Sequence, residues 1–68
     1  MEYQDFLQIQ SALTLSGSVI DRMGVLEEVV SLSFPTEEDR DRVIRYLDRT
    51  GYFQVQVLRG CGLNITRF

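Results

Sequence analysis

The side chain best suited to covalent chemistry in this sequence is Cys61, which two glycines flank close to Arg59. A nearby cation favours the thiolate and makes a cysteine more reactive. Nucleophilic catalysis by a thiol also needs a base, and the chain contains no histidine. We therefore interpret Cys61 as a residue of a tight connection, and we predict neither a catalytic site nor an enzymatic activity.

Metal and cofactor chemistry has little support from the other residue types. Zinc sites are built mainly from cysteine and histidine, and the chain has a single residue of these two types. The ten acidic residues could hold Mg²⁺, but no buried cleft can be inferred in a chain of 68 residues. We expect no metal, no cofactor and no small-molecule substrate. The lone cysteine also excludes an intramolecular disulfide.

The acidic side chains point to recognition rather than catalysis, since the net charge is −3. They would form one negative patch if the turn before residue 29 lay near the start of a helix expected over residues 37–49. Such a patch would imitate a phosphate backbone toward a protein that binds nucleic acid, whereas most acids at helix N-termini only complement the helix dipole. The candidate acidic patch consists of Glu27, Glu28, Glu37, Glu38 and Asp41, with Asp21 and Asp39 beside it.

Three arginines, Arg42, Arg45 and Arg49, share the outer surface of the same expected helix. They could bind phosphates or an acidic partner. Acidic residues are interleaved with them and weaken the local field, so a solvated helix face is the simpler interpretation. Together with the negative total charge, this pattern argues against direct binding of nucleic acid.

The helix over residues 37–49 is the clearest element of the sequence. Thr36 is a good N-cap residue, and Gly51 suits the left-handed position that follows a last helical turn. Acids lie in the first turn and arginines in the last, as the helix dipole favours. The apolar stripe of this helix consists of Val43, Ile44 and Leu47.

Alternation of apolar and polar residues predicts β-strands on both sides of this helix. Residues 52–59 and 63–68 alternate around a tight connection, which indicates a C-terminal hairpin. Residues 28–34 alternate in the same way just before the helix. Each of these strands therefore has one face suited to a core and one suited to solvent.

The N-terminal third is compatible with two structures. Residues 7–15 place apolar side chains at every second position and favour a strand. The alternative is a helix that begins at Tyr3 and ends before Gly17. Residues 19–24 fit either a strand or a single helical turn, and we leave both open.

These elements predict one small α+β domain over residues 1–68, with the order β-β-α-β-β. A single amphipathic helix packs on one face of a four-stranded sheet and leaves the other face wet. The sheet is expected to be mostly antiparallel. The passage from residue 29 through the helix to residue 58 would add a right-handed crossover between parallel strands and make the sheet mixed.

The uncovered sheet face is the surface that we expect to bind a protein partner. It is polar but almost free of charge, whereas solvated faces usually carry charged cross-strand pairs. Amide and hydroxyl groups around a tyrosine can form hydrogen bonds at a small desolvation cost. The expected partner-binding residues are Gln8, Gln10, Tyr52, Gln54 and Gln56, and the same face would include Ala12, Thr14, Ser31, Ser33, Asn64 and Thr66.

The function that these observations favour is a small non-enzymatic protein-binding module that inhibits or regulates a larger protein. In size and element order the chain resembles phage and mobile-element inhibitors of host enzymes, including anti-CRISPR proteins, which implies a nucleic-acid-handling partner. The alternative is a structural subunit that forms a homodimer or larger homo-oligomer through sheet edges or faces. Residues 1–5 lack the basic stretch of a signal peptide and no apolar run reaches membrane-spanning length, so we expect a cytoplasmic protein without membrane contact.

Overall fold

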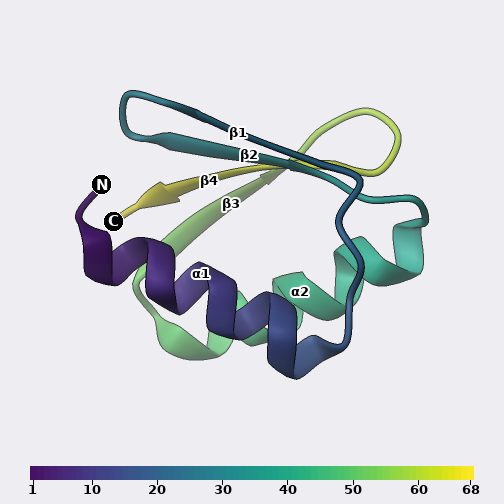
Figure 1. Cartoon of the computed structure of the whole chain (residues 1–68), viewed down its shortest axis with the longest axis horizontal. Helices are drawn as coiled ribbons and strands as arrows, with labels where there is room; N and C mark the ends of the chain where they lie inside the picture. The colour runs from purple at the N-terminus through teal and green to yellow at the C-terminus, as the bar shows by residue number, and fades with distance from the viewer.

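The computed structural model describes residues 1–68 and places two helices on one side of a four-stranded sheet (Figure 1). The sheet has the order β1-β2-β4-β3, and every neighbouring pair is antiparallel. The α+β class and the order β-β-α-β-β are confirmed, with one additional helix in front of the strands. The elements are α1 (Tyr3–Ser16), β1 (Arg22–Leu26), β2 (Val29–Ser33), α2 (Glu37–Thr50), β3 (Phe53–Val57) and β4 (Gly62–Arg67).

Helix α2 forms where the sequence predicts it. The Thr36 side chain accepts a hydrogen bond from the Asp39 backbone N–H at 3.2 Å, which satisfies one of the free donors of the first turn. Gly51 ends the helix with a φ of 72°, a left-handed conformation that glycine adopts without strain. Val43 and Leu47 are fully buried beneath the helix, so the predicted apolar stripe is its core face.

The strand favoured over residues 7–15 is wrong, because this segment belongs to helix α1. A reciprocal capping box between Glu2 and Asp5 begins the helix, and Gly17 ends it with a φ of 68°. Ile9 and Ala12, three residues apart, are buried on one side of the helix. The physical reason is coverage, since the single stripe of α2 is too narrow to shield four strands from water.

The undecided segment around residues 19–24 contributes to a strand rather than a helical turn. Strand β1 pairs with β2 in a hairpin whose loop consists of Glu27 and Glu28, and Glu27 has a φ of 53°. The first strand of the sheet is therefore β1, and residues 7–15 contribute none. Because the loop has two residues, the register of the hairpin is tightly fixed.

The expected mixed sheet is wrong, because β4 lies between β2 and β3 and every neighbouring pair is antiparallel. Strands β2 and β3 do run in the same direction, but each pairs with β4 in an antiparallel ladder. The register places Val30 opposite Ile65 and Leu32 opposite Leu63, so apolar residues of both central strands share the face under the helices. This match of buried residues favours the insertion of β4.

The core lies between the helices and strands β2, β4 and β3, and all of its buried apolar side chains form one cluster. Both helices contribute to the cluster, while β1 contributes no buried residue. The buried apolar residues are Ile9, Ala12, Val30, Leu32, Phe34, Val43, Leu47, Phe53, Leu63 and Ile65.

Candidate interaction surface

The outer face of the sheet is the side that the helices leave uncovered. Cross-strand pairs bring its side chains together: Ser31 lies opposite Asn64, and Asn64 lies opposite Gln56 on the next strand. The Ser31 hydroxyl donates a hydrogen bond to Asn64 Oδ1 at 2.7 Å, which leaves the Asn64 amide donors for another acceptor. The outer sheet face is defined here by its uncharged polar residues on β2, β3 and β4, and Arg22 of β1, opposite Ser33, is a charged residue at its border: the defining residues are Ser31, Ser33, Gln54, Gln56, Asn64 and Thr66.

A shallow hollow of about 450 Å³ lies on this face between β3 and β4. Gln54 and Gln56 form one wall, and Asn64 and Thr66 form the other. The free-energy cost of removing water is smaller for amide and hydroxyl groups than for charged groups. The hollow therefore suits a partner surface that presents its own hydrogen-bonding groups.

The structure does not place Gln8 and Gln10 on this face. Both residues are exposed on helix α1, on the opposite side of the sheet from the predicted interface. Their assignment to the sheet face depended on the strand over residues 7–15, and it fails with that strand. Gln54 and Gln56 lie on β3 as predicted, so the structure brings together only the C-terminal part of the predicted set.

Tyr52 lies at the end of the sheet, just before β3. Its ring and the Phe53 ring form a T-shaped pair, with the two centroids 6.5 Å apart and the planes at 89°. The guanidinium carbon of Arg67 lies 5.1 Å from the centroid of the Tyr52 ring. Tyr52 is therefore a rim residue of the outer sheet face, partly held by neighbours in its own chain.

The ion pair between Asp5 and Arg67 is a feature that the sequence analysis missed. Asp5 is a buried residue of α1, and its carboxylate accepts a hydrogen bond from the guanidinium of Arg67 on β4. The same carboxylate accepts a bond from the Glu2 backbone N–H at 3.1 Å. These contacts join the start of α1 to the end of the sheet. The two residues are 62 positions apart, and no local pattern pairs them.

The candidate acidic patch is not one surface. The loop with Glu27 and Glu28 lies beside the chain termini, whereas α2 begins at the other end of the molecule (Figure 1). The N-terminal amine of Met1 binds Glu28 at 2.5 Å, which supports the same placement. Ion pairs with arginines also offset three acids at the start of α2: Glu38 and Asp39 lie 2.7 and 3.4 Å from Arg42, and Asp41 lies 3.1 Å from Arg40.

The arginines on the outer side of α2 have contacts within the chain. Arg42 binds both Glu38 and Asp39, and Arg49 lies over the Tyr46 ring with its guanidinium carbon 5.3 Å from the centroid. Arg45 is exposed. The interleaved acids thus occupy this surface as the sequence analysis expected, and they leave no continuous basic strip.

Cys61 is a free, half-buried thiol in the connection between β3 and β4, and it packs against the core. Its backbone carbonyl accepts a hydrogen bond from the Phe34 N–H at 2.9 Å, which ties the connection to the end of β2. No group of three or more histidine, cysteine or acidic side chains lies close enough to hold a metal ion. Neither helix is both long enough and apolar enough to cross a membrane.

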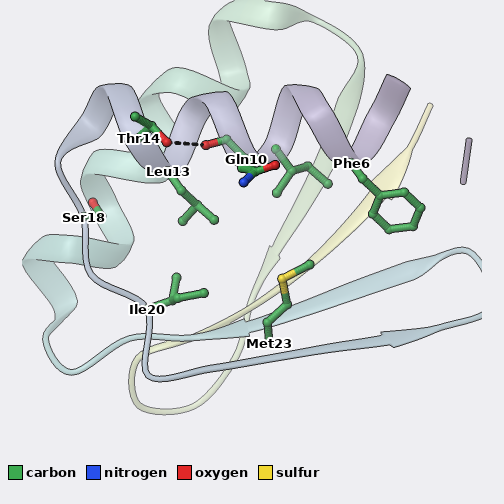
Figure 2. Close-up of a pocket in the computed structure, with 8 residues that line it drawn as sticks. Phe6, Gln10, Leu13, Thr14, Ser18, Ile20 and Met23 are labelled. Atoms are coloured by element: carbon green, nitrogen blue, oxygen red, sulfur yellow. Dashed lines mark hydrogen bonds between the residues drawn. The ribbon is translucent and has the colours of Figure 1, made fainter. Parts of the chain in front are cut away.

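A groove between α1 and β1 is a second surface that the sequence analysis missed. Figure 2 shows Met23 and Ile20 rising from the β1 side toward Phe6 and Leu13 on the helix. The groove has a volume of about 420 Å³ and is lined mostly by apolar side chains. Its detection from sequence would have required the correct assignment of both α1 and β1.

Comparison with known proteins adds no relative to this description. No family model, no curated protein and no solved structure matches the chain.

Proposed function

We propose that this chain is a small non-enzymatic protein-binding module that inhibits or regulates a larger protein by occupying one of its surfaces. The observation that supports the proposal is the outer sheet face, which carries six uncharged polar residues and no helix. The backbone of a sheet is already ordered, so a partner has to order only the side chains of this face when it binds. The partner is a protein surface rich in hydrogen-bonding groups.

The partner class has weaker support than the binding surface. A nucleic-acid-handling partner, as in phage and mobile-element inhibitors, is proposed from size and element order alone. A single acidic patch that imitates phosphates would have supported such a partner, but the acidic residues lie at two ends of the molecule. Direct binding of nucleic acid is not proposed, because the net charge is −3 and the α2 arginines lie among acids.

The alternative function is a structural subunit that assembles with copies of itself through sheet edges or faces. The free outer edges of β1 and β3 favour this alternative. An open assembly that uses both edges grows in mass as the protein concentration rises, whereas a protein-binding module reaches a fixed small mass. Solution mass over a wide concentration range separates the two.

Gln54→Arg tests the proposed binding face, and Gln8→Arg is its matched control. Both glutamines are exposed, but Gln54 lies on the outer sheet face and Gln8 lies on α1. We expect Gln54→Arg to weaken partner binding by about 1–3 kcal/mol, largely through faster dissociation, because it places a charge in an uncharged interface. The measurement is surface plasmon resonance with a partner isolated from the host lysate by the wild-type chain.

The control variant should bind the same partner with wild-type affinity. Binding through the outer sheet face should also change little with added salt, because few exposed charges take part. If a folded Gln54→Arg variant binds as tightly as the wild type while Gln8→Arg binds weakly, the partner uses the helical side and the proposed face is wrong.

A further inference from the structure

Strand β1 is an edge strand with an unusual degree of exposure. It lies at the end of the sheet and pairs with β2 only. All five of its residues are exposed, although Met23 and Val25 lie opposite the buried Leu32 and Val30 and therefore on the helix side. Free edges with apolar side chains are templates for pairing with another strand.

The other edge strand is better covered. Helix α2 packs on β3, where Phe53 is buried and Val55 is half-buried. On the β1 side, α1 stands away from the strand and leaves the groove between Phe6, Leu13, Ile20 and Met23 (Figure 2). Within the two edge strands, β1 therefore exposes three large apolar side chains, Met23, Val25 and Leu26, whereas β3 exposes one, Val57.

Gly24 at the centre of β1 has no explanation within one chain. It has no left-handed φ, and a side-chain carbon built on it would meet no atom within 4 Å. Glycine weakens a strand interior, and it often marks a position where another backbone approaches closely. The middle of the free edge is therefore shaped for a backbone neighbour.

We propose that a second copy of this chain pairs with β1 in an antiparallel, two-fold symmetric ladder centred on Gly24. The residues that flank a two-residue hairpin loop form a hydrogen-bonded pair, here Leu26 and Val29. The alternation of antiparallel pairing then directs the backbone groups of Met23 and Val25 to the free edge. In the dimer these groups bond to one another, and each Met23 lies opposite Val25 of the second copy.

The side chains select this register over its neighbours. Side chains alternate between the two faces of a strand, so the partner of each residue must shift by two positions if Met23 and Val25 of both copies are to stay on the helix side. One such shift would place Val25 opposite Asp21 of the second copy, and the other would place Met23 opposite Glu27. Only the ladder centred on Gly24 pairs apolar side chains with apolar side chains twice.

The ends of this ladder bring together charges of both signs from the two copies. Arg22 is the only basic side chain before residue 40, and it would lie near the acidic loop of Glu27 and Glu28 in the second copy. The same register places Asp21 opposite Glu27 of the second copy, also twice, and this like-charge pair lies beyond the paired strands, where water screens the repulsion. The Arg22 contact occurs twice in the dimer.

The surface available is sufficient for an interface of ordinary size. Such interfaces bury about 800 Å² on each partner, which is about a sixth of the 4634 Å² surface of this chain. The ladder covers β1 itself, and the second copy also narrows the groove beside α1. The exposed apolar residues of β1 and of the segment that leads into it are Val19, Ile20, Met23, Val25 and Leu26.

The dimer has one continuous eight-stranded sheet with all four helices on the same side. It duplicates the outer sheet face without covering it, so the inference does not depend on what that face binds. If the chain proves to be monomeric, the proposed protein-binding function still stands. If the outer sheet face proves to bind no partner, the proposed dimer still stands.

The test compares Val25→Lys with Val57→Lys in sedimentation velocity from low micromolar to millimolar concentration. Val25 and Val57 are 52% and 54% exposed, both lie on the helix side, and they belong to opposite edge strands. A lysine that points inward on an edge strand blocks edge pairing. We expect Val25→Lys to raise the dimer dissociation constant at least tenfold and Val57→Lys to change it less than twofold.

A wild-type chain that remains monomeric at millimolar concentration would overturn the proposal. A dimer that Val57→Lys dissociates and Val25→Lys preserves would overturn it as well, since the β3 edge would then be the interface. Circular dichroism checks that each variant is folded before its mass is measured.

If Val25→Lys fails to fold, disulfide cross-linking between the two copies tests the same ladder. Residues opposite each other in a non-hydrogen-bonded antiparallel pair have Cα atoms about 4.5 Å apart, within the range that a disulfide spans. In a Cys61→Ser background treated with oxidised glutathione, Gly24→Cys should form a covalent dimer at micromolar concentration. Gln54→Cys on β3 should not, and equal cross-linking of the two variants would contradict the ladder.

Discussion

The two halves of this chain have the same order of elements and reach different degrees of burial. Each half is a helix followed by a hairpin, α1-β1-β2 in one and α2-β3-β4 in the other, and the inner strands β2 and β4 pair at the centre. In the second half both strands contribute buried residues, Phe53 from β3 and Leu63 and Ile65 from β4. In the first half β2 contributes to the core and β1 contributes no buried residue.

The difference shows that strand pairing and helix cover are separate requirements. Both edge strands have a complete ladder on one side, but only β3 lies beneath a helix. Helix α1 is held by Ile9, Ala12 and the Asp5–Arg67 ion pair, which position it away from β1. The less covered half is consequently the one with surface left for another molecule.

The largest expected difference between the halves comes from leucine truncation. Leu47 is 0% exposed under α2, whereas Leu26 at the end of β1 is 76% exposed. We expect Leu47→Ala to lower the free energy of unfolding by about 2–4 kcal/mol, because it removes buried contacts and leaves a cavity. Leu26→Ala should change it by less than about 0.5 kcal/mol in urea titrations at low micromolar protein.

Equal destabilisation by the two alanine variants would show that β1 is as well packed as the core. It would place the difference between the halves in doubt, and with it the reason for a second copy at β1.

A smaller effect is expected from the ion pair that joins α1 to the sheet. Asp5 is 4% exposed, so Arg67→Met leaves a buried carboxylate without its cation. We expect a loss of about 1–3 kcal/mol in the free energy of unfolding, at the lower end because the Arg67 side chain is about half exposed. Arg59→Met is the control, since Arg59 is exposed in a connection. Thermal denaturation of both variants measures the difference, and an unchanged Arg67→Met would mean that other contacts hold α1.

The second half could be predicted from sequence because its signals are local. Thr36 and Gly51 mark the limits of α2, and the alternation of residues 53–57 distinguishes a strand from a helix without reference to the rest of the chain. The outer sheet face followed from the same alternation, so Gln54 and Gln56 were placed correctly. A local pattern is sufficient where the spacing of the apolar residues fits only a helix or only a strand.

The first half could not be predicted in the same way, because the spacing of its apolar residues fits both a strand and a helix. Leu7, Ile9, Leu13 and Leu15 alternate like a strand, while Ile9 and Ala12 with Asp5 lie on one helical face. Only the need to cover four strands with more than one helix decides between the two, and that requirement is global. The insertion of β4 beside β2, the Asp5–Arg67 contact and the α1–β1 groove depend on the same global arrangement.

The smallest predicted effects have opposite signs at two glycines, one in each half. Gly51 ends α2 at a φ of 72°, so Gly51→Ala forces a side chain into a strained conformation and should lower the free energy of unfolding by about 1 kcal/mol. Gly24 in β1 has no left-handed φ and open space around it, so Gly24→Ala should raise that free energy by up to about 1 kcal/mol by reducing the freedom of the unfolded chain. Urea titrations at low micromolar protein keep self-association out of the measurement. A loss of stability in Gly24→Ala would show that β1 requires glycine within the single chain, and the backbone of a second copy would no longer be needed to explain it.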